Sequence, residues 1–400
     1  MFLKKILFIF FWLLDYSFIS KKKGWVFHGY TGLPIGNNLA LFKSVLQNDK
    51  RLAPFFWTGK VAPNIPEACK FFKKIPRREE SILEHVRYLL FLLRFKVISV
   101  ESPADLNDYF QFLPQKRRVI VLLPHGFTLK TSGITAPHLS PKQKRVWSKV
   151  GKEFDLISAS SRLESYMISA TVNCPINNVV VMGQQRKIAN KVWTKKEKLD
   201  AKKIFETAYS KLLHDNKLVV YAPTHRDHEI NSSRPCLFGF KNLEILNREL
   251  IKNKSLLLIR EHAIASEKEQ VDYSNIIYSP SGPTIEFSHI CPAVNLLITD
   301  YSGIFVDWLA SDVRFAFWQY DIESYRDKRG FWIPEEIFSV GAKIKTPSDF
   351  IELVSSNTKS VDEKQSSRFW KNILYENTQN EALTKTADEI YKKTKEKRLI

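Results

Sequence analysis

The sequence predicts two α/β domains, each built on a parallel sheet. The chain has 400 residues, which is more than a single hydrophobic core usually serves. Short apolar segments alternate with amphipathic ones along it, a pattern typical of β-α-β units. Polar or charged residues directly follow several of the apolar segments. Such residues would lie at the carboxyl edge of a parallel sheet, where this class of domain binds its ligands.

The composition is that of a folded protein with anionic partners. Hydrophobic residues make up 44% of the chain and the formal net charge is +19. This excess favours phosphorylated substrates, nucleic acid or an anionic membrane surface. Nucleic acid is not an expected partner, because the charge is scattered and no nucleic-acid motif accompanies it. The four cysteines show neither disulfide nor metal-ligand spacing, which favours buried thiols in a reducing compartment.

Residues 1–23 are predicted to form an amphipathic segment that associates with the membrane. A run of nine apolar residues, Ile6 to Leu14, lies between lysines at 4–5 and 21–23. The run is too short to span a bilayer, but aromatic residues between lysines are typical of a helix lying in an anionic interface. An uncleaved signal-like segment and a plain core helix are the two alternatives.

The remaining chain is predicted to divide into two α/β domains, residues 24–195 and residues 196–365, and a C-terminal helix with a basic tail, residues 366–400. The first domain opens with a strand, a glycine-rich loop and a helix, but it lacks the GxGxxG pattern of dinucleotide binding. The predicted strands are Phe95–Val100, Arg118–Leu123, Phe154–Ser158, Asn178–Met182, Lys217–Tyr221, Ser255–Ile259, Asn275–Tyr278, Asn295–Ile298 and Arg314–Trp318. A loop rich in charged and aromatic residues is predicted at 319–332, and one long helical run at 368–397.

Polar groups of compatible chemistry follow five of these strands. They are His125 to Lys130, Arg186, Thr224 with Arg226, Arg260 with His262, and Ser302 with Gly303 and Asp307. Two domains with facing carboxyl edges would bring all five around one cleft. Arginine, serine and free backbone N–H groups can bind a diphosphate, and a carboxylate can bind ribose hydroxyls.

His125 is the candidate general base, since a histidine at a strand end can take a proton from a hydroxyl near neutral pH. A loop histidine that caps a turn is the alternative. Ser302 has a similar alternative, because a serine between a strand and a helix is often only an N-cap.

No metal site is expected. His225 and His228 would need a helix to converge on one ion, and Pro223 with the Asn, Ser and Pro residues that follow favours a loop. No paired carboxylate or DxD motif is evident, so cations and N–H groups of the protein would stabilise a leaving group. The residues alone therefore predict transfer of a nucleotide-activated group.

Three segments resemble the CDP-glycerol glycerophosphotransferase family, whose members build or prime wall teichoic acids and related polyol-phosphate polymers. These are Tyr-Ala-Pro-Thr-His-Arg-Asp at 221–227, Leu-Ile-Thr-Asp-Tyr-Ser at 297–302, and the segment from Tyr320 to Phe331. Residues 125–130 are similar to the family's His-Gly-Thr-Pro-Leu-Lys, and residues 183–186 to its Gly-Tyr-Pro-Arg. The segment Gly-Asn-Asn-Leu-Ala at 36–40 is a looser match.

The resemblance implies a GT-B fold, with two Rossmann-like domains facing across a cleft, and an enzyme that needs neither metal nor cofactor. Such an enzyme moves a polyol phosphate, glycerol phosphate foremost, from a CDP-activated donor to a hydroxyl of a lipid-linked acceptor and releases CMP. It would be a peripheral protein at the cytoplasmic face of the cell membrane. The alternative is a GT-B glycosyltransferase that uses a nucleotide sugar.

The resemblance implies that residues 24–195 form the acceptor domain and residues 196–365 the CDP-donor domain. It also implies roles for individual residues. His125 would be the base for the acceptor hydroxyl, and His262 a second catalytic residue beside the diphosphate. The substrate-binding residues would be Gly126, Thr128, Lys130, Arg186, Pro223, Thr224, Arg226, Arg260, Ser302, Gly303 and Asp307, with Asp307 on the cytidine ribose. Gly303 stands where the family has a second serine, so one hydroxyl donor is lost while the backbone N–H remains.

Overall fold

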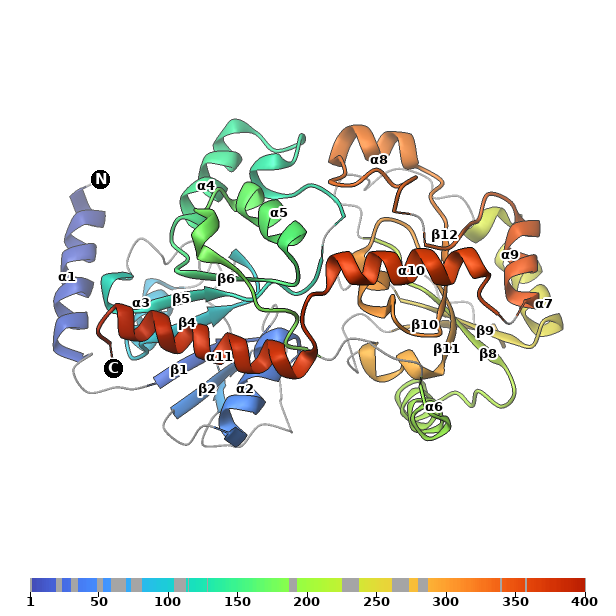
Figure 1. Ribbon diagram of the computed structural model, residues 1–400, viewed down its shortest axis with the longest axis horizontal. Coiled ribbons are helices and arrows are strands. Elements are labelled where there is room, and N and C mark those ends of the chain that lie inside the picture. Colours follow the sequence, from blue (N-terminus) through green and yellow to red (C-terminus); the bar gives the residue numbers. More distant parts are fainter. Residues whose placement is uncertain are drawn as a thin grey trace. The chain divides into compact units, whose positions relative to one another are not determined.

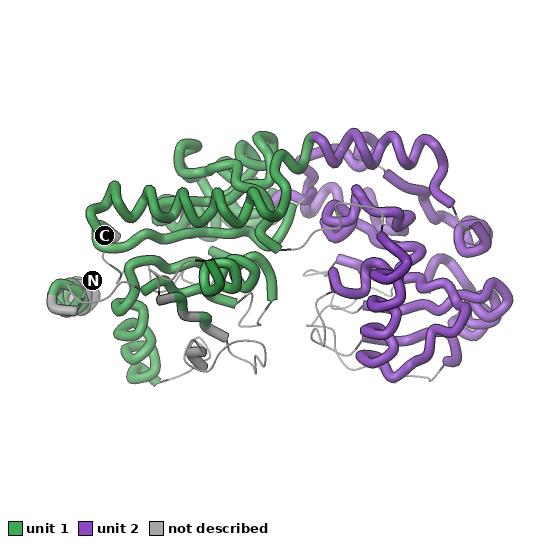
Figure 2. Tube along the Cα trace, turned by 60° about the horizontal axis from the view of Figure 1, so that its bottom comes forward, with its two compact units in different colours: residues 1–127, 132–187, 373–400 green, residues 128–131, 188–372 purple. Residues whose placement is uncertain are grey.

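The computed structural model describes residues 2–18, 24–29, 35–48, 53–58, 70–72, 81–103, 113, 115–127, 129–186, 193–224, 237–260, 273–279, 287–338, 340–356 and 358–399. The chain forms two compact units, coloured separately in Figure 2. Unit 1 comprises residues 1–127, 132–187 and 373–400, and unit 2 comprises residues 128–131 and 188–372. The residues from 373 onward, predicted as a separate tail, are therefore part of unit 1.

Unit 1 is built on a seven-stranded sheet whose named strand pairs are all parallel. Its order is β3-β2-β1-β4-β5-β6-β7, the Rossmann order extended by β7. The order reverses between β1 and β4, which makes this the topological switch point. The strands are β1 (Gly24–His28), β2 (Ala53–Thr58), β3 (Lys70–Phe72), β4 (Val97–Val100), β5 (Val119–Leu122), β6 (Leu156–Ala159) and β7 (Val179–Val181).

Helices cover both faces of this sheet (Figure 1). Trp25 and Phe27 of β1 pack with residues of α2 (Asn37–Asn48) and α11 (Gln379–Glu396), including Phe42 and Ile390. Val26 points the other way and joins a core with α3 (Ile82–Leu92), α4 (Pro141–Gly151) and α5 (Arg162–Val172). The alternation follows from the two-residue period of a strand.

Unit 2 repeats the plan with a six-stranded sheet ordered β10-β9-β8-β11-β12-β13, again with parallel pairs and again in Rossmann order. Its switch point lies between β8 and β11. The strands are β8 (Lys217–Tyr221), β9 (Ser255–Ile259), β10 (Ile276–Tyr278), β11 (Val294–Thr299), β12 (Arg314–Phe317) and β13 (Ala342–Lys343).

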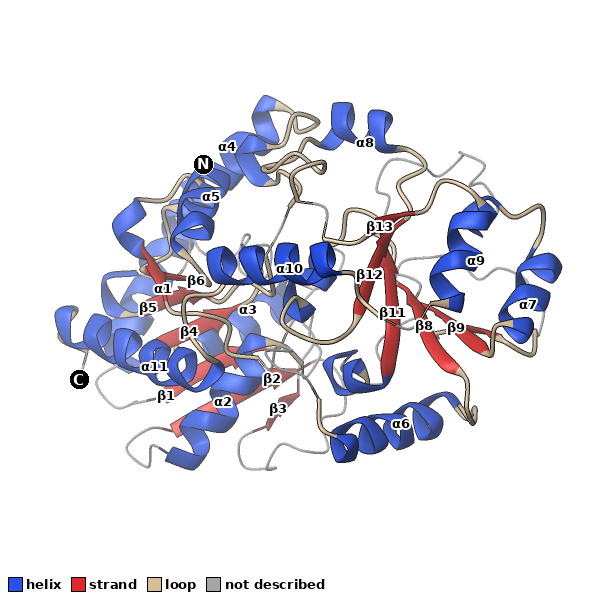
Figure 3. Cartoon of the chain, turned by 45° about the vertical axis from the view of Figure 1, so that its right-hand side comes forward, coloured by secondary structure: helices blue, strands red, loops and turns tan. Residues whose placement is uncertain are grey.

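Helices α7 (Leu243–Lys252) and α9 (Pro347–Ser355) pack on one face of the second sheet. Figure 3 shows α6 (Lys195–Tyr209) on the opposite side from them. Helix α10 (Val361–Leu374) runs to the boundary at which the chain returns to unit 1. Residues 368–397, predicted as one helical run, thus form parts of two helices, because Thr378 and Glu381 make a capping box that starts α11 afresh.

Two further predictions of local structure are wrong. Residues 319–332, predicted as a loop, contain the helix α8 (Ile322–Arg329), which ends at Gly330. Tyr325 is the residue that α8 buries. The sequence of this helix therefore has no apolar stripe from which it could be predicted. The helix predicted after Ser302 is a six-residue 3₁₀ helix, η12 (Gly303–Trp308), and not an α-helix.

The N-terminal helix α1 (Phe2–Phe18) packs on unit 1. Phe11 and Leu14 join the core on the α3 side of the sheet. Asp15 and Arg118 form an ion pair at 2.6 Å, and both side chains are 0% exposed. Burial raises the pKa of the Asp15 carboxyl and lowers that of the Arg118 guanidinium, and the charge of each partner opposes the other's shift.

The other side of α1 is apolar and exposed. Its exposed residues are Ile6, Ile9, Phe10, Trp12, Leu13 and Tyr16. Among the described residues, no helix combines the length and hydropathy that crossing a membrane requires. Helix α1 thus resembles a core helix on one side, which packs into unit 1, and an interfacial helix on the other side, which is apolar and exposed.

Removing the Asp15 carboxylate should leave the Arg118 charge buried and unpaired. We expect Asp15→Ala to lower the free energy of unfolding by about 3 kcal/mol, the usual cost of breaking a buried pair. The double variant Asp15→Leu with Arg118→Met should recover most of that loss, because neither charge remains. Urea denaturation measures both. A single variant as stable as the unaltered protein would show that the pair does not hold α1.

Candidate functional site

The carboxyl edge of the first sheet brings His125, Gly126 and Arg186 together. His125 and Gly126 follow β5, where His125 is exposed, and Arg186 follows β7 and is half-buried. A Cβ on Gly126 would lie 2.9 Å from Nη2 of Arg186. Glycine therefore leaves the space in which the guanidinium rests. The predicted base and a permanent cation consequently share one cluster of loops in unit 1.

Asn37, the first residue of α2, connects these loops. Its Nδ2 donates to the Pro124 carbonyl at 2.6 Å and to Oε1 of Gln184 at 2.9 Å. Its Oδ1 accepts from the backbone N–H of Arg186 at 2.8 Å. The sequence analysis assigned no role to Asn37 or Gln184, although they lie in the family-like segments 36–40 and 183–186.

The loop before Arg186 is held by the returning C-terminal helix. Nε2 of Gln185 donates to Oγ1 of Thr386 in α11 at 2.8 Å and to the Gly183 carbonyl at 2.8 Å. Nε2 of Gln379 donates to the Gln185 carbonyl at 3.1 Å. The position of Arg186 thus depends on a helix almost 200 residues later in the sequence.

A protein carboxylate fills the switch point of the first sheet. The backbone N–H of Asn38 donates to Oε1 of Glu101 at 2.7 Å, and Glu101 is buried. Gly36 has φ of +92°, and a Cβ there would clash with the same carboxylate. This negative charge at the start of α2 would repel a phosphate.

The switch point of the second sheet is organised differently. Oδ1 of Asp300 accepts from the Thr224 N–H at 2.8 Å and from its hydroxyl at 2.7 Å. It also accepts from the N–H of Tyr301. Asp300 therefore ties the loop after β8 to the loop after β11. The Thr224 hydroxyl donates its hydrogen to Asp300. Thr224 would therefore contribute to a ligand site by holding the backbone of its loop in position.

Ser302, Gly303 and Asp307 lie in and after this loop. Ser302 is the N-cap of η12, and its Oγ accepts from Ile304 N–H at 3.4 Å, which is a long hydrogen bond. Ser302 and Gly303 are half-buried, and Asp307 is 8% exposed. The short 3₁₀ helix offers little macrodipole, so anion binding here would rest on individual N–H and hydroxyl groups.

Arg260 supplies the cation of this edge. It follows β9, the neighbour of β8, so Arg260, Pro223 and Ser302 come from three adjacent strands. The Arg260 guanidinium lies over the Phe287 ring, 4.8 Å from its centre, a contact that orients it without neutralising its charge. Pro223 is half-buried at the end of β8.

The segment that follows His125 along the chain belongs to unit 2. Lys130 forms an isolated antiparallel bridge with Phe331. The Trp332 N–H donates to the Leu129 carbonyl at 2.8 Å, and the Thr131 N–H to the Gly330 carbonyl at 3.1 Å. The two family-like segments at 125–130 and 320–331 are thus joined by backbone hydrogen bonds.

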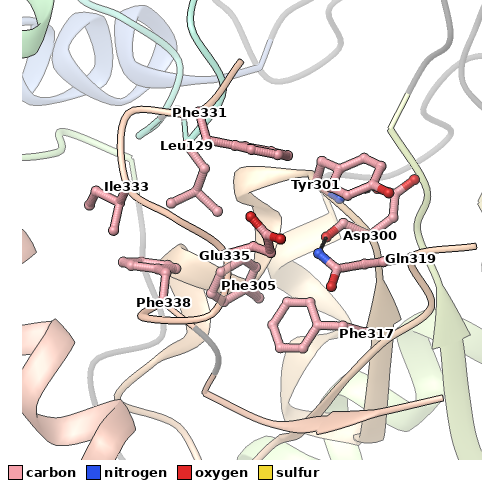
Figure 4. Close-up of a pocket in the computed structure, with 10 residues that line it drawn as sticks. All are labelled: Leu129, Asp300, Tyr301, Phe305, Phe317, Gln319, Phe331, Ile333, Glu335 and Phe338. Atoms are coloured by element: carbon pink, nitrogen blue, oxygen red, sulfur yellow. Dashed lines mark hydrogen bonds between the residues drawn. The ribbon is translucent and has the colours of Figure 1, made fainter. Parts of the chain in front are cut away.

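An aromatic wall supports the loop after β11. Tyr301 stacks on Tyr325 with ring centres 3.9 Å apart, and its hydroxyl donates to Oδ1 of Asp321 at 2.9 Å. In Figure 4, Gln319 reaches the Asp300 carbonyl through a 3.2 Å hydrogen bond. The pocket in that view is lined by Leu129, Asp300, Tyr301, Phe305, Phe317, Gln319, Phe331, Ile333, Glu335 and Phe338.

Three predicted site residues, Thr128, Arg226 and His262, lie outside the described residues, as do His225 and His228. Within the described part of the chain, no group of three or more metal-ligating side chains occurs.

Two Rossmann-like units with polar carboxyl edges define a GT-B-like protein, as the resemblance implied. Comparison with solved structures agrees. A structure of the wall teichoic acid polymerase TagF soaked with CDPG matches with a TM-score of 0.75 and 18% identity, covering 98% of this chain and 94% of that one. Anabaena HepE in complex with UDP and glucose matches with a TM-score of 0.52 and 11% identity, covering 92% of this chain and 99% of that one. At these identities, both matches show a shared fold.

The chain belongs to the CDP-glycerol:poly(glycerophosphate) glycerophosphotransferase family, whose model matches residues 12–392. It is 29% identical to the teichoic acid poly(glycerol phosphate) polymerase of Bacillus spizizenii over 164 residues, and these residues cover 40% of this chain and 41% of that protein. It is 24% identical over 333 residues to the poly(ribitol-phosphate) polymerase of the same organism, 80% of this chain and 51% of that protein. The matches thus span about half or less of these relatives' lengths.

His28, at the end of β1, gives unit 1 a predictable response to pH. Burial lowers its pKa to about 4, so the folded protein resists a proton that the unfolded chain takes up near pH 6.5. Stability should therefore be complete above pH 6.5 and fall as the pH drops toward 4, by about 3 kcal/mol in total. Chemical denaturation at pH 7 and pH 4.5 should show a loss that His28→Leu largely removes. An equal loss in that variant would assign the effect to other groups.

Proposed function

We propose that this protein transfers a polyol phosphate, glycerol phosphate foremost, from a CDP-activated donor to a hydroxyl of a lipid-linked acceptor, and releases CMP. Membership of the glycerophosphotransferase family carries the proposal. The relatives include polymerases of glycerol phosphate and of ribitol phosphate, so both CDP-polyols are donors to test. The product would be a cell-surface polymer of the teichoic acid type.

The division of groups between the two sheet edges supports this chemistry. In unit 1, His125 would take the proton of the acceptor hydroxyl as its oxygen attacks the β-phosphorus of the donor. In unit 2, Arg260, the Ser302 hydroxyl and the Gly303 N–H would stabilise the charge that develops on the diphosphate. The bond from the β-phosphorus to the bridging oxygen breaks, CMP leaves, and a new phosphodiester joins polyol and acceptor. Asp307 would hold the cytidine ribose.

Release of CMP is the direct test. Purified protein should release CMP from CDP-glycerol or CDP-ribitol when a prenyl-diphosphate-linked acceptor is present. If neither donor yields CMP while a nucleotide sugar yields a nucleoside diphosphate, the protein is a glycosyltransferase instead. Absence of both products overturns a transferase function with these substrates.

Two substitutions separate the proposed base from the donor site. We expect His125→Ala to lower kcat by about 10³-fold, within the range for loss of a general base, with CDP-polyol affinity unchanged. We expect Asp307→Ala to weaken CDP-polyol binding about tenfold, as the loss of a hydrogen bond to a charged group would. Initial rates measure kcat, and calorimetry measures the affinity for the CDP-polyol.

His214→Ala and Asp215→Ala are matched controls, because both residues are exposed in the loop before β8, at the amino edge of the second sheet. Both controls should behave as the unaltered protein. Turnover that survives His125→Ala would place the base elsewhere. Unchanged donor affinity in Asp307→Ala would remove Asp307 from the donor site.

We also propose that the exposed side of α1 holds the protein at the cytoplasmic face of the membrane, beside its lipid-linked acceptor. The apolar and aromatic side chains of that side, flanked in sequence by lysines at 4–5 and 21–23, have the chemistry of an interfacial helix on anionic lipid. The buried Asp15–Arg118 pair would keep that side turned outward.

Trp12→Ser with Leu13→Ser should reduce binding to anionic phosphatidylglycerol vesicles at least about tenfold, because two large apolar groups are lost from the interface. Ile82→Ser with Leu83→Ser is the matched control, since these residues are 81% and 67% exposed at the start of α3. Vesicle flotation measures both variants. Equal losses in the two, or none in the first, would contradict the role of α1.

A further inference from the structure

Asn37 occupies a position that only one side-chain chemistry satisfies. It is 1% exposed, and it faces a carbonyl oxygen of Pro124 on one side and the backbone N–H of Arg186 on the other. The carbonyl can only accept and the N–H can only donate, so the side chain must present a donor and an acceptor together. An amide does so. A carboxylate of the same shape would place an oxygen against the Pro124 carbonyl, and an aliphatic chain would leave both groups unpaired.

The groups that Asn37 joins belong to two separate loops. Pro124 immediately precedes His125 after β5, and Gln184 and Arg186 follow β7. Strand β6 lies between β5 and β7 in the sheet, so the ladder hydrogen bonds do not join these two strand ends directly. The side chain of Asn37 enters from α2 and bridges them.

We propose that Asn37 is a positioning residue for the transfer step, which holds the His125 loop and Arg186 in one arrangement. The inference rests on the proposed function, in which His125 takes the proton of the acceptor hydroxyl. The Arg186 guanidinium also lies close to Gly126, where a Cβ would be 2.9 Å from Nη2, so the two loops lie side by side. Asn37 itself has its amide fully engaged and buried, so it acts through these loops and does not touch substrate.

The adjacent residue provides a matched control. Asn38 is 0% exposed and also uses its amide fully. Its Nδ2 donates to the His28 carbonyl at 2.8 Å and the Ser99 carbonyl at 3.1 Å, and its Oδ1 accepts from the Ser99 hydroxyl at 2.6 Å. Those partners belong to β4 and the end of β1, away from the His125 loop. Asn37 and Asn38 are therefore equal in burial and hydrogen bonding but differ in what they hold.

The experiment compares Asn37→Leu with Asn38→Leu in the full chain, with CDP-glycerol or CDP-ribitol, whichever the unaltered protein uses. Both variants should lose stability to urea to a similar extent. Per folded molecule, Asn37→Leu should lower kcat about 100-fold, the size of effect that a misplacement near 1 Å produces, with donor affinity unchanged. Asn38→Leu should keep kcat within about threefold. Adding Gln184→Leu to Asn37→Leu should cost nothing further, because both act on one loop arrangement.

Turnover by Asn37→Leu within about threefold of the unaltered protein would overturn the inference alone. An equal loss of kcat in Asn38→Leu would overturn it too, since the effect would then be one of general stability. If Asn37→Leu does not fold, Asn37→Asp is measured with the same expectations, because it keeps the acceptor for the Arg186 N–H. Failure of the unaltered protein to release CMP would instead overturn the proposed function, and this inference with it.

Discussion

The hydrogen bonding of the Asp300 carboxylate is the interaction on which the carboxyl edge of the second sheet depends. It receives both polar hydrogens of Thr224 and the N–H of Tyr301, so one buried charge closes the switch point of the second sheet. Strand ends of a parallel sheet offer unpaired backbone groups, and a charged acceptor that gathers several of them is strongly stabilised. The loop with Ser302 and Gly303 starts directly from this anchor. Its position is therefore fixed before any ligand arrives.

The two units share one strand order but differ in the residues at their carboxyl edges. In the first sheet the switch point is filled by Glu101, and His125 and Arg186 lie farther along the edge, after β5 and β7. In the second sheet a buried carboxylate, that of Asp300, also lies at the switch point, where it accepts hydrogen bonds from Thr224 and Tyr301. Arg260 follows the neighbouring strand β9. The donor site that we propose in the second unit relies on Arg260 for its positive charge. The duplicated topology thus carries different side chains at its two carboxyl edges.

Much of this could be predicted from the sequence, and the exceptions have physical causes. Buried strands such as β8 and β9 are apolar runs with sharp polar ends, so their bounds match the prediction. Helix α8 was missed because Tyr325 is the residue that it buries, so the helix has no apolar stripe. His125 and Arg186 were predicted as candidates because they follow recognisable strands. Asn37 and Gln185 were not, because amides carry no charge and their partners, such as Thr386, are distant in sequence.

The return of α11 to the first unit has a consequence for how the protein is made. The ribosome completes strands β1 to β7 and then all of the second unit before residues 379–396 emerge. Until then the face of the first sheet that bears Trp25 and Phe27 lacks Ile390, and Gln185 lacks Thr386. Domains generally fold in the order of synthesis. Here the first unit cannot complete its packing until the second unit has been synthesised. Nascent chains would therefore expose the aromatic surface formed by Trp25 and Phe27, which chaperones recognise.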